Sequence, residues 1–167
     1  PFPPNNTYFE VDFSGFHQPR KEDIYSAINQ TINSMLNPPI KNLGIKGIMH
    51  TSKELQKWSD IFNDNELRMN LFSLYIYIEV GGTGGGCFRY MYSRFLAESA
   101  RITGNEKLLG PAEKIRKSGE LFSATGQLFV DVEKADCLKE MIYQASSNFV
   151  KIYNIETEDF KELSDSI

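Results

Sequence analysis

The residues most able to do chemistry lie between Glu79 and Leu96, in the stretch EVGGTGGGCFRYMYSRFL. Five glycines fall within six residues there, and a cysteine, an arginine and several aromatic side chains follow. Backbone N–H groups at the start of a helix attract anions, and glycine lets a ligand approach the backbone closely. The ending Gly-Cys-Phe does not fit a P-loop, and no βαβ unit surrounds the glycines, so neither phosphate-binding motif applies. The glycines could equally let two helices meet closely, and both interpretations stay open.

Cys87 is the candidate nucleophile of this stretch. It falls in the predicted first turn of a helix, a position that lowers the pKa of a thiol. A nucleophilic cysteine usually needs a neighbouring base, and the chain contains only His17 and His50. A pair of Cys87 and His50 would require hydrogen-bond reach, which sequence alone does not establish. The commoner role of such a cysteine is that of a small buried apolar residue, and we predict no catalytic residue in this chain.

Arg89 and Tyr92 follow the glycines and are the other candidates for binding. Arg89 could hold a carboxylate or phosphate above the glycine loop, or it could form a salt bridge between helices. The acidic residues from Glu156 onwards are expected to be solvated on a frayed terminal helix. Histidines and cysteines are too few and too scattered for a metal site, and no cofactor is predicted.

The composition excludes several classes of function. The chain has 167 residues, which suits one domain with its own core, and a net charge of −4 without any basic stripe. Nucleic acid is therefore not an expected partner. No apolar run reaches the roughly 18 residues that would span a bilayer. Two cysteines do not make a disulfide framework, so a reducing cytoplasm is the expected location.

Hydrophobic periodicity predicts an all-α fold, a bundle of five to seven helices with one short N-terminal β segment. Residues 9–13, FEVDF, alternate apolar and acidic side chains as a half-buried strand does. We therefore expect residues 1–18 to be a linker and a short strand from a preceding domain, and residues 19–167 to be the helical domain. The start of the chain suggests a fragment or a C-terminal domain.

Several helix boundaries and faces are predicted within this bundle. Apolar spacing indicates a helix over 21–36, Thr51 resembles the first residue of a capping box, and Asn63 resembles a helix cap. Residues 67–80 are ambiguous between strand and helix, and helix is preferred. One long helix carries a narrow seam with two small residues that permit close packing; its members are Ile115, Gly119, Phe122, Gly126 and Phe129.

The order of motifs along the chain resembles a known family. PFPPNN, YFEVDF, a helix ending in NPP, NLGIKGI leading to LQKW, and finally EVGGTGGGCFRYMYSRFLAES occur in succession. This pattern resembles the C-terminal helical domain of the butirosin biosynthesis protein H family. Residues 1–99 carry the resemblance by motif and the remainder by helical character, and the glycine-rich segment is the most specific part.

The resemblance implies a helical accessory domain that is inactive alone. In that family a papain-like N-terminal domain carries the nucleophile and base, and the butirosin protein transfers an acyl group from a carrier-protein thioester to an amine. The implied partners are therefore a catalytic domain of the same protein and an acyl carrier protein, with self-association as a further expectation. The implied substrate-binding residues are Gly82, Thr83, Gly84, Gly85, Gly86, Arg89 and Tyr92. The alternative is a stand-alone helical module that binds a small anion or a partner helix.

Overall fold

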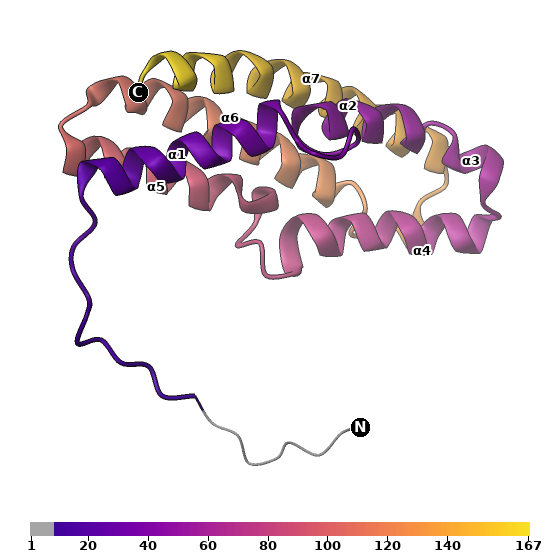
Figure 1. Cartoon of the computed structure of the whole chain (residues 1–167). Coiled ribbons are helices and arrows are strands. Elements are labelled where there is room, and N and C mark those ends of the chain that lie inside the picture. The colour runs from indigo at the N-terminus through magenta and orange to yellow at the C-terminus, as the bar shows by residue number, and fades with distance from the viewer. Residues whose placement is uncertain (1–8) are drawn as a thin grey trace.

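The computed structural model describes residues 9–167, and this part of the chain is all-α (Figure 1). Short π- and 3₁₀-helical turns lie in several of the connections between the α-helices. The α-helices are α1 (Lys21–Leu36), α2 (Gly44–Leu55), α3 (Trp58–Ile61), α4 (Asp64–Tyr75), α5 (Arg89–Thr103), α6 (Leu109–Gln127) and α7 (Leu138–Asp165). The shorter turns are η1 (Ile76–Val80), η2 (Gly86–Phe88), η3 (Glu106–Leu108) and η4 (Val132–Lys134).

The predicted N-terminal strand does not form within the described residues. Residues 9–13 have no regular secondary structure, and the side chains of Phe9, Val11 and Phe13 are exposed. A strand is stable only when a neighbour satisfies its backbone and covers one face, and the helical body offers no such edge. The first eight residues of the predicted linker lie outside the described part of the chain.

The long helix α7 organises the bundle. It packs against α6 on one side and against α2 on another, while α6 packs against α5 with its remaining face (Figure 1). All five residues of the predicted seam are buried, and four of them lie on α6, while Phe129 follows the end of the helix. Gly119 and Gly126 lie in this seam, and an added Cβ would come within 3.2 Å of neighbouring atoms at either position. Small residues therefore let α6 approach its neighbours closely.

Two apolar clusters lie along the bundle. One joins α2, α4, η1 and the facing halves of α6 and α7, with Leu55, Leu71 and Phe129 among its most buried members. The other joins α1 and α5 to the opposite halves of α6 and α7, around Ile28 and Leu96. The second cluster borders the cavity described below.

Local boundary predictions were partly right. The first helix has the predicted bounds, and Asn63 caps α4 by accepting a hydrogen bond from the Glu66 N–H at 3.1 Å. The capping box expected at Thr51 is wrong, because this residue lies inside α2 and its hydroxyl donates to the carbonyl of Gly47. Residues 67–80 are helical as preferred, with the last five forming the π-helical turn η1.

Candidate functional site

The glycine-rich segment reverses the chain between η1 and α5 through a left-handed turn. Five consecutive residues, from Gly84 to Phe88, have positive φ. Cys87 and Phe88 have φ of 50° and 68°, which costs a residue with a side chain about 1–2 kcal/mol each. The turn delays the start of α5 to Arg89, two residues later than the cysteine-led helix start predicted from sequence. It also places the Phe88 ring at the rim of a cavity, where the ring is 47% exposed.

The C-terminal half of the segment is fastened to the helical body. The Glu79 carboxylate accepts hydrogen bonds from the Gly86 N–H at 3.0 Å and from the Ser123 hydroxyl at 2.7 Å. Gly86 lies so close to α6 that an added Cβ would be 2.9 Å from the carbonyl oxygen of Gly119. Gly86 therefore permits close packing of the turn against α6. Its N–H, a donor that an anion could have used, is already satisfied by a side chain of the same chain.

The predicted binding residues divide into two groups. The Thr83 hydroxyl is buried and donates to the carbonyl of Ile78 at 2.7 Å. Space around Gly82 and Gly84 is open, with nothing within 4 Å of an added Cβ. None of the five residues from 82 to 86 lines the cavity described next, whereas Arg89 and Tyr92 do.

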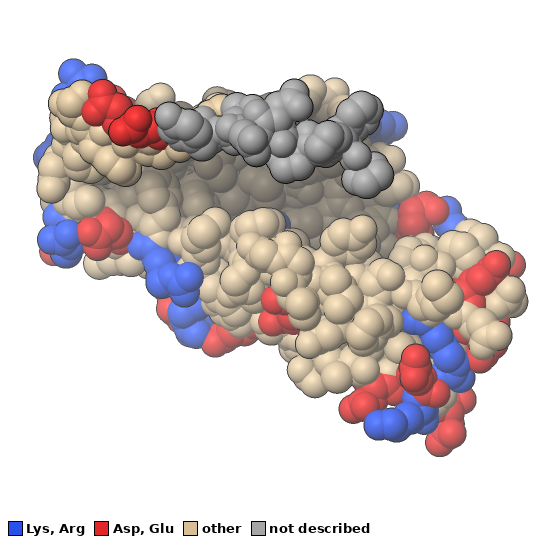
Figure 2. All heavy atoms as spheres, turned by 90° about the horizontal axis from the view of Figure 1, so that it is seen from below, with Lys and Arg blue, Asp and Glu red and all other residues tan. Residues whose placement is uncertain are grey.

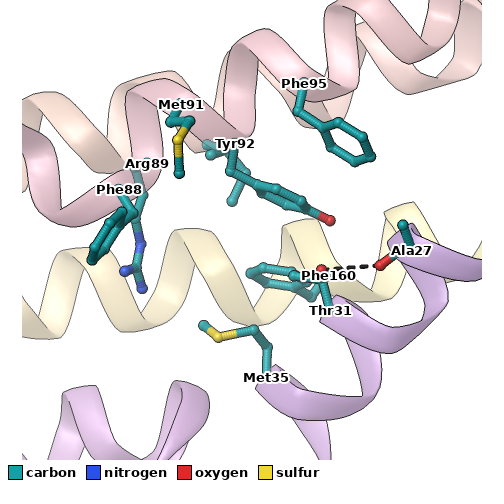
Figure 3. A pocket seen from close by; sticks show the side chains of 10 residues that line it. Ala27, Thr31, Met35, Phe88, Arg89, Met91, Tyr92, Phe95 and Phe160 are labelled. Carbon is teal, nitrogen blue, oxygen red and sulfur yellow. Dashed lines mark hydrogen bonds between the residues drawn. The ribbon is translucent and has the colours of Figure 1, made fainter. Parts of the chain in front are cut away.

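A cavity of about 470 Å³ lies between α1 and α5. The close-up in Figure 3 shows α1 on one side, α5 on the other, and Phe160 of α7 between them. The face seen from below in Figure 2 is hollowed, and the surface around the hollow is largely free of charged side chains. The lining is mostly apolar and consists of Ala27, Thr31, Met35, Phe88, Arg89, Met91, Tyr92, Phe95, Ile115 and Phe160.

Aromatic stacking fixes the orientation of Tyr92. Its ring is stacked with Phe95 at a centroid distance of 5.8 Å and with Phe160 at 6.2 Å. The hydroxyl points towards α1, near Thr31 (Figure 3). Burial raises the pKa of Tyr92 to about 12, and the nearby Thr31 hydroxyl offsets only part of this rise. The phenol therefore keeps its proton at neutral pH.

Arg89 forms a buried ion pair with Glu156 of α7. Its Nε and Nη2 donate to the two carboxylate oxygens at 2.8 and 2.9 Å, and Nη1 donates to the carbonyl of Cys87 at 2.9 Å. The Ser118 hydroxyl also donates to Glu156, and the guanidinium lies 4.6 Å from the centre of the Phe122 ring. Burial lowers the pKa of Arg89, but the charge and hydrogen bonds of Glu156 outweigh this and raise it. Of the two roles open to Arg89, the structure therefore shows the salt bridge between helices.

The expectation of a solvated acidic tail was wrong for Glu156 and Asp159, although Glu158 is exposed as expected. α7 continues to Asp165, and its last turns bury Glu156, Asp159 and Phe160 against α6. The carboxylate of Asp159 is buried without a hydrogen-bond partner among residues 9–167. Burial raises its pKa to about 7, while the positive charge of Lys114 acts in the opposite direction. The sequence pattern concealed this because the exposed residues of the same turns, such as Glu158, are also acidic.

Cys87 does not have the environment of an activated thiol. Burial raises its pKa, and the charge of Arg89 opposes that effect only in part. The other member of the suggested pair, His50, has its Nε2 3.2 Å from the side-chain amide of Asn42. Because of the left-handed turn, Cys87 precedes α5 and does not lie in its N-terminal turn, where the helix would have lowered the thiol pKa.

Residues 9–167 contain neither a metal-binding cluster nor a membrane-spanning helix. No cluster of three or more His, Cys, Asp or Glu side chains in this range could hold a metal ion. Nor does any helix in this range have the length and apolar character required to cross a membrane.

The fold and site together define an all-α domain with one mostly apolar cavity next to a buried ion pair. The chain belongs to the family described as "Domain of unknown function (DUF4872)", which matches residues 1–163. Comparison with curated proteins and with solved structures gives no match.

Proposed function

We propose that this domain is the substrate-binding accessory domain of a cysteine acyltransferase that resembles the butirosin biosynthesis protein H family. Its cavity would hold the acyl part of the substrate while a separate catalytic domain performs the transfer. The observation that carries the proposal is the mostly apolar cavity of about 470 Å³. That volume is within the range of small-molecule sites, and an apolar lining favours an apolar ligand group. The glycine-rich motif links the domain to this class of enzyme through resemblance.

The arrangement of charges favours an acyl group over a small anion. Within residues 9–167, Arg89 is the only cationic residue that lines the cavity, and Glu156 already neutralises it. The Gly86 N–H is likewise occupied by Glu79. An anion entering the cavity would lose its hydration without gaining an unpaired charge, which is unfavourable.

Exposed apolar side chains at the rim support docking to another domain. Phe88 and Met91 both line the cavity, and about half of each side chain is exposed. Upstream of α1, Phe9, Phe13 and Phe16 are more than 70% exposed. Apolar surface of this kind marks interaction sites. The proposed partner is the catalytic domain of the same protein, to which an acyl carrier protein would deliver the thioester.

A stand-alone module that binds a partner helix is the second candidate. The cavity lies between two roughly facing helices, α1 and α5, as grooves that accept amphipathic helices do (Figure 3). The gene distinguishes the two candidates. A catalytic domain encoded directly upstream of Pro1 favours the accessory domain, and its absence from the complete gene product favours the module.

Filling the cavity in the full-length gene product tests the proposal. Ala27 lines the cavity but is exposed at its edge, so Ala27→Phe can occupy the cavity without overpacking the core. Ala97→Phe is the matched control, because Ala97 is an exposed residue of α5 that does not line the cavity. We expect kcat/KM for acyl transfer from a carrier-protein thioester to an amine to fall about tenfold or more in the first variant only. Equal rates in the two variants would reject a role for the cavity in acyl transfer.

A further inference from the structure

The segment before α1 carries its apolar side chains into water. Residues 9–20 are exposed throughout. Four large apolar side chains of this segment are each at least 68% exposed, namely those of Phe9, Val11, Phe13 and Phe16. Within the described part of the chain, the hydrogen bonds of residues 9–19 stay inside the segment, and none joins it to the helical body. Apolar surface in water gains free energy when another apolar surface covers it.

The apolar side chains of the segment can share one face. Phe9, Val11 and Phe13 alternate with Glu10 and Asp12, so an extended backbone directs the apolar and the acidic side chains to opposite sides. A turn follows, in which the Phe16 N–H donates to the carbonyl of Phe13 at 2.9 Å. The segment is therefore able to lie with its apolar face on a surface while its carboxylates remain in water.

The cavity between α1 and α5 offers an apolar surface of matching size. Phe88 and Met91 form part of its wall and are each about half exposed. A cavity of about 150 Å³ holds one benzene ring, so a cavity of about 470 Å³ has room for roughly three phenyl rings. Arg89 is already paired with Glu156, which leaves apolar side chains as the favoured occupants.

The segment starts on the open side of the cavity and is long enough to cross it. Figure 1 shows it leaving the start of α1 towards the lower side, and Figure 2 looks into the hollow from that side. At a rise of about 1.5 Å per residue, Ala27 and Met35 lie roughly 9 and 21 Å along α1 from Lys21. Residues 9–20 span up to roughly 40 Å when extended. The chain can therefore turn back beside α1 and reach the far end of the cavity.

We propose that residues 9–18 form a strap that folds back antiparallel to α1 and covers the cavity, with Phe13 and Phe16 inserted between α1 and α5. The structure shows the open state of this strap. A covalently attached segment is favoured over a separate molecule, because a short linker gives an effective concentration in the millimolar range.

The inference goes beyond the proposed function, because it holds for any ligand of the cavity. A closed strap fills the space that a ligand would take, so strap and ligand compete. The same side chains cannot contact the cavity and another domain at once. Docking of another domain to them would therefore open the strap.

Methionine methyl groups test the inference, because Met35 and Met91 line the cavity and the exposed Met69 lies outside it. The 167-residue chain is prepared with ¹³C-labelled methionine methyl groups, once as the wild type and once with Phe13→Ser and Phe16→Ser combined. We expect the signals of Met35 and Met91 to shift in the double variant, because two phenyl rings leave the cavity, while the Met69 signal stays in place. Identical Met35 and Met91 signals in the two proteins would overturn the inference.

Two controls show that the effect belongs to the strap and to one chain. Tyr143→Ser removes an aromatic ring of α7 that is as exposed as Phe16, and it should leave the Met35 and Met91 signals unchanged. The wild-type signals should also be independent of protein concentration. A change of these signals with concentration, together with a dimer mass in sedimentation, would mean that the segment covers the cavity of a second copy, and would overturn the intramolecular strap.

Binding of the uncharged fluorescent probe N-phenyl-1-naphthylamine measures the competition. The apparent affinity of a site falls in proportion to the fraction of molecules in which it is open. The variant with both phenylalanines replaced should therefore bind the probe about two- to tenfold more tightly than the wild type, and Tyr143→Ser should bind it as the wild type does. Equal affinities of the wild type and the double variant would overturn the strap and leave the cavity as a binding site, so this inference can fail without the proposed function.

Discussion

Replacing Asp159 by asparagine should stabilise the protein at neutral and alkaline pH but not in acid. The carboxylate is fully buried on α7 and accepts no hydrogen bond within residues 9–167. Burial above all, with smaller contributions from the charges of Glu162 and Glu156 on the same helix, raises its pKa from 3.8 to about 7. Lys114, facing it from α6, lowers the pKa but is held in a salt bridge with Glu162.

The magnitude follows from the difference between the folded and unfolded pKa. Between pH 3.8 and about 7 the folded state binds one more proton at this site than the unfolded state does. Raising the pH through this window therefore lowers the free energy of unfolding by about 1.4 kcal/mol per unit, with roughly 4 kcal/mol as the upper limit. The contribution of the protonated carboxyl is fully present below pH 3.8 and is lost by the time the pH exceeds about 7. Relaxation around the ionised group reduces the expected loss to about 2–4 kcal/mol.

Urea unfolding of the wild type and Asp159→Asn at pH 4.5, 6 and 8 measures this difference. The gap, which is the free energy of unfolding of Asp159→Asn minus that of the wild type, should increase by about 2–3 kcal/mol between pH 4.5 and pH 8. Carboxylates that do not interact with residue 159 contribute equally to both proteins and cancel in the gap. Glu158→Gln, at an exposed position of the same turn, is the matched control. A constant gap for Asp159→Asn would refute the assignment of a buried carboxyl that is neutral when folded.

Three further predictions concern the glycine segment and the ion pair. Arg89→Met should lower the free energy of unfolding, measured in urea titrations, by about 3–5 kcal/mol, because it leaves Glu156 charged and buried. Adding Glu156→Leu should restore most of the lost stability. A double variant no more stable than Arg89→Met would contradict this prediction. Gly86→Ala should lower the free energy of unfolding clearly more than Gly84→Ala, because of these two glycines only Gly86 combines a positive φ with a clash against α6. Equal losses of about 1–2 kcal/mol in the two variants would mean that the turn can move away from the helix. Cys87 should react with a neutral thiol reagent much more slowly in the native protein than in urea, since burial raises its pKa; equal rates would argue for an accessible thiolate.

Helix positions were predictable where local chemistry and burial agree. The apolar spacing of residues 21–36 reproduces α1, and the side chain of Asn63 begins α4 as its type suggests. The structure shows no strand at residues 9–13, because alternation indicates which side chains could share a face but not whether a partner strand exists. The capping box predicted at Thr51 was wrong for a related reason, since the same residue pattern is also compatible with the interior of a helix.

The candidate site was only half predictable. Arg89 and Tyr92 were found because they follow a conspicuous motif, and both line the cavity. Thr31 and Phe160 also line the cavity but were not predicted. They reach it because α1 and α7 pack against α5 over long distances in the sequence, and no short sequence pattern predicts such packing. Glu156 was assigned to solvent because its neighbours are acidic; its i, i+4 relation to Phe160 was the available signal of a buried face.

The glycine segment shows why composition alone did not decide between its two roles. Gly86 serves close packing against α6, while Gly82 and Gly84 meet nothing within 4 Å. Both uses of glycine occur within one loop, and only the three-dimensional arrangement separates them. The left-handed backbone continues into Phe88, whose ring it directs to the edge of the cavity.

The central claim is that the cavity between α1 and α5 binds the acyl part of a ligand. The most direct test is an amide chemical-shift titration of the isotopically labelled chain with butyrophenone. The account predicts saturable shifts concentrated on residues 27–35 of α1 and 88–95 at the start of α5, with Phe160 of α7 responding as well. Shifts that avoid these residues, or that gather on the exposed face of α4 around Met69 and Phe72, would contradict it.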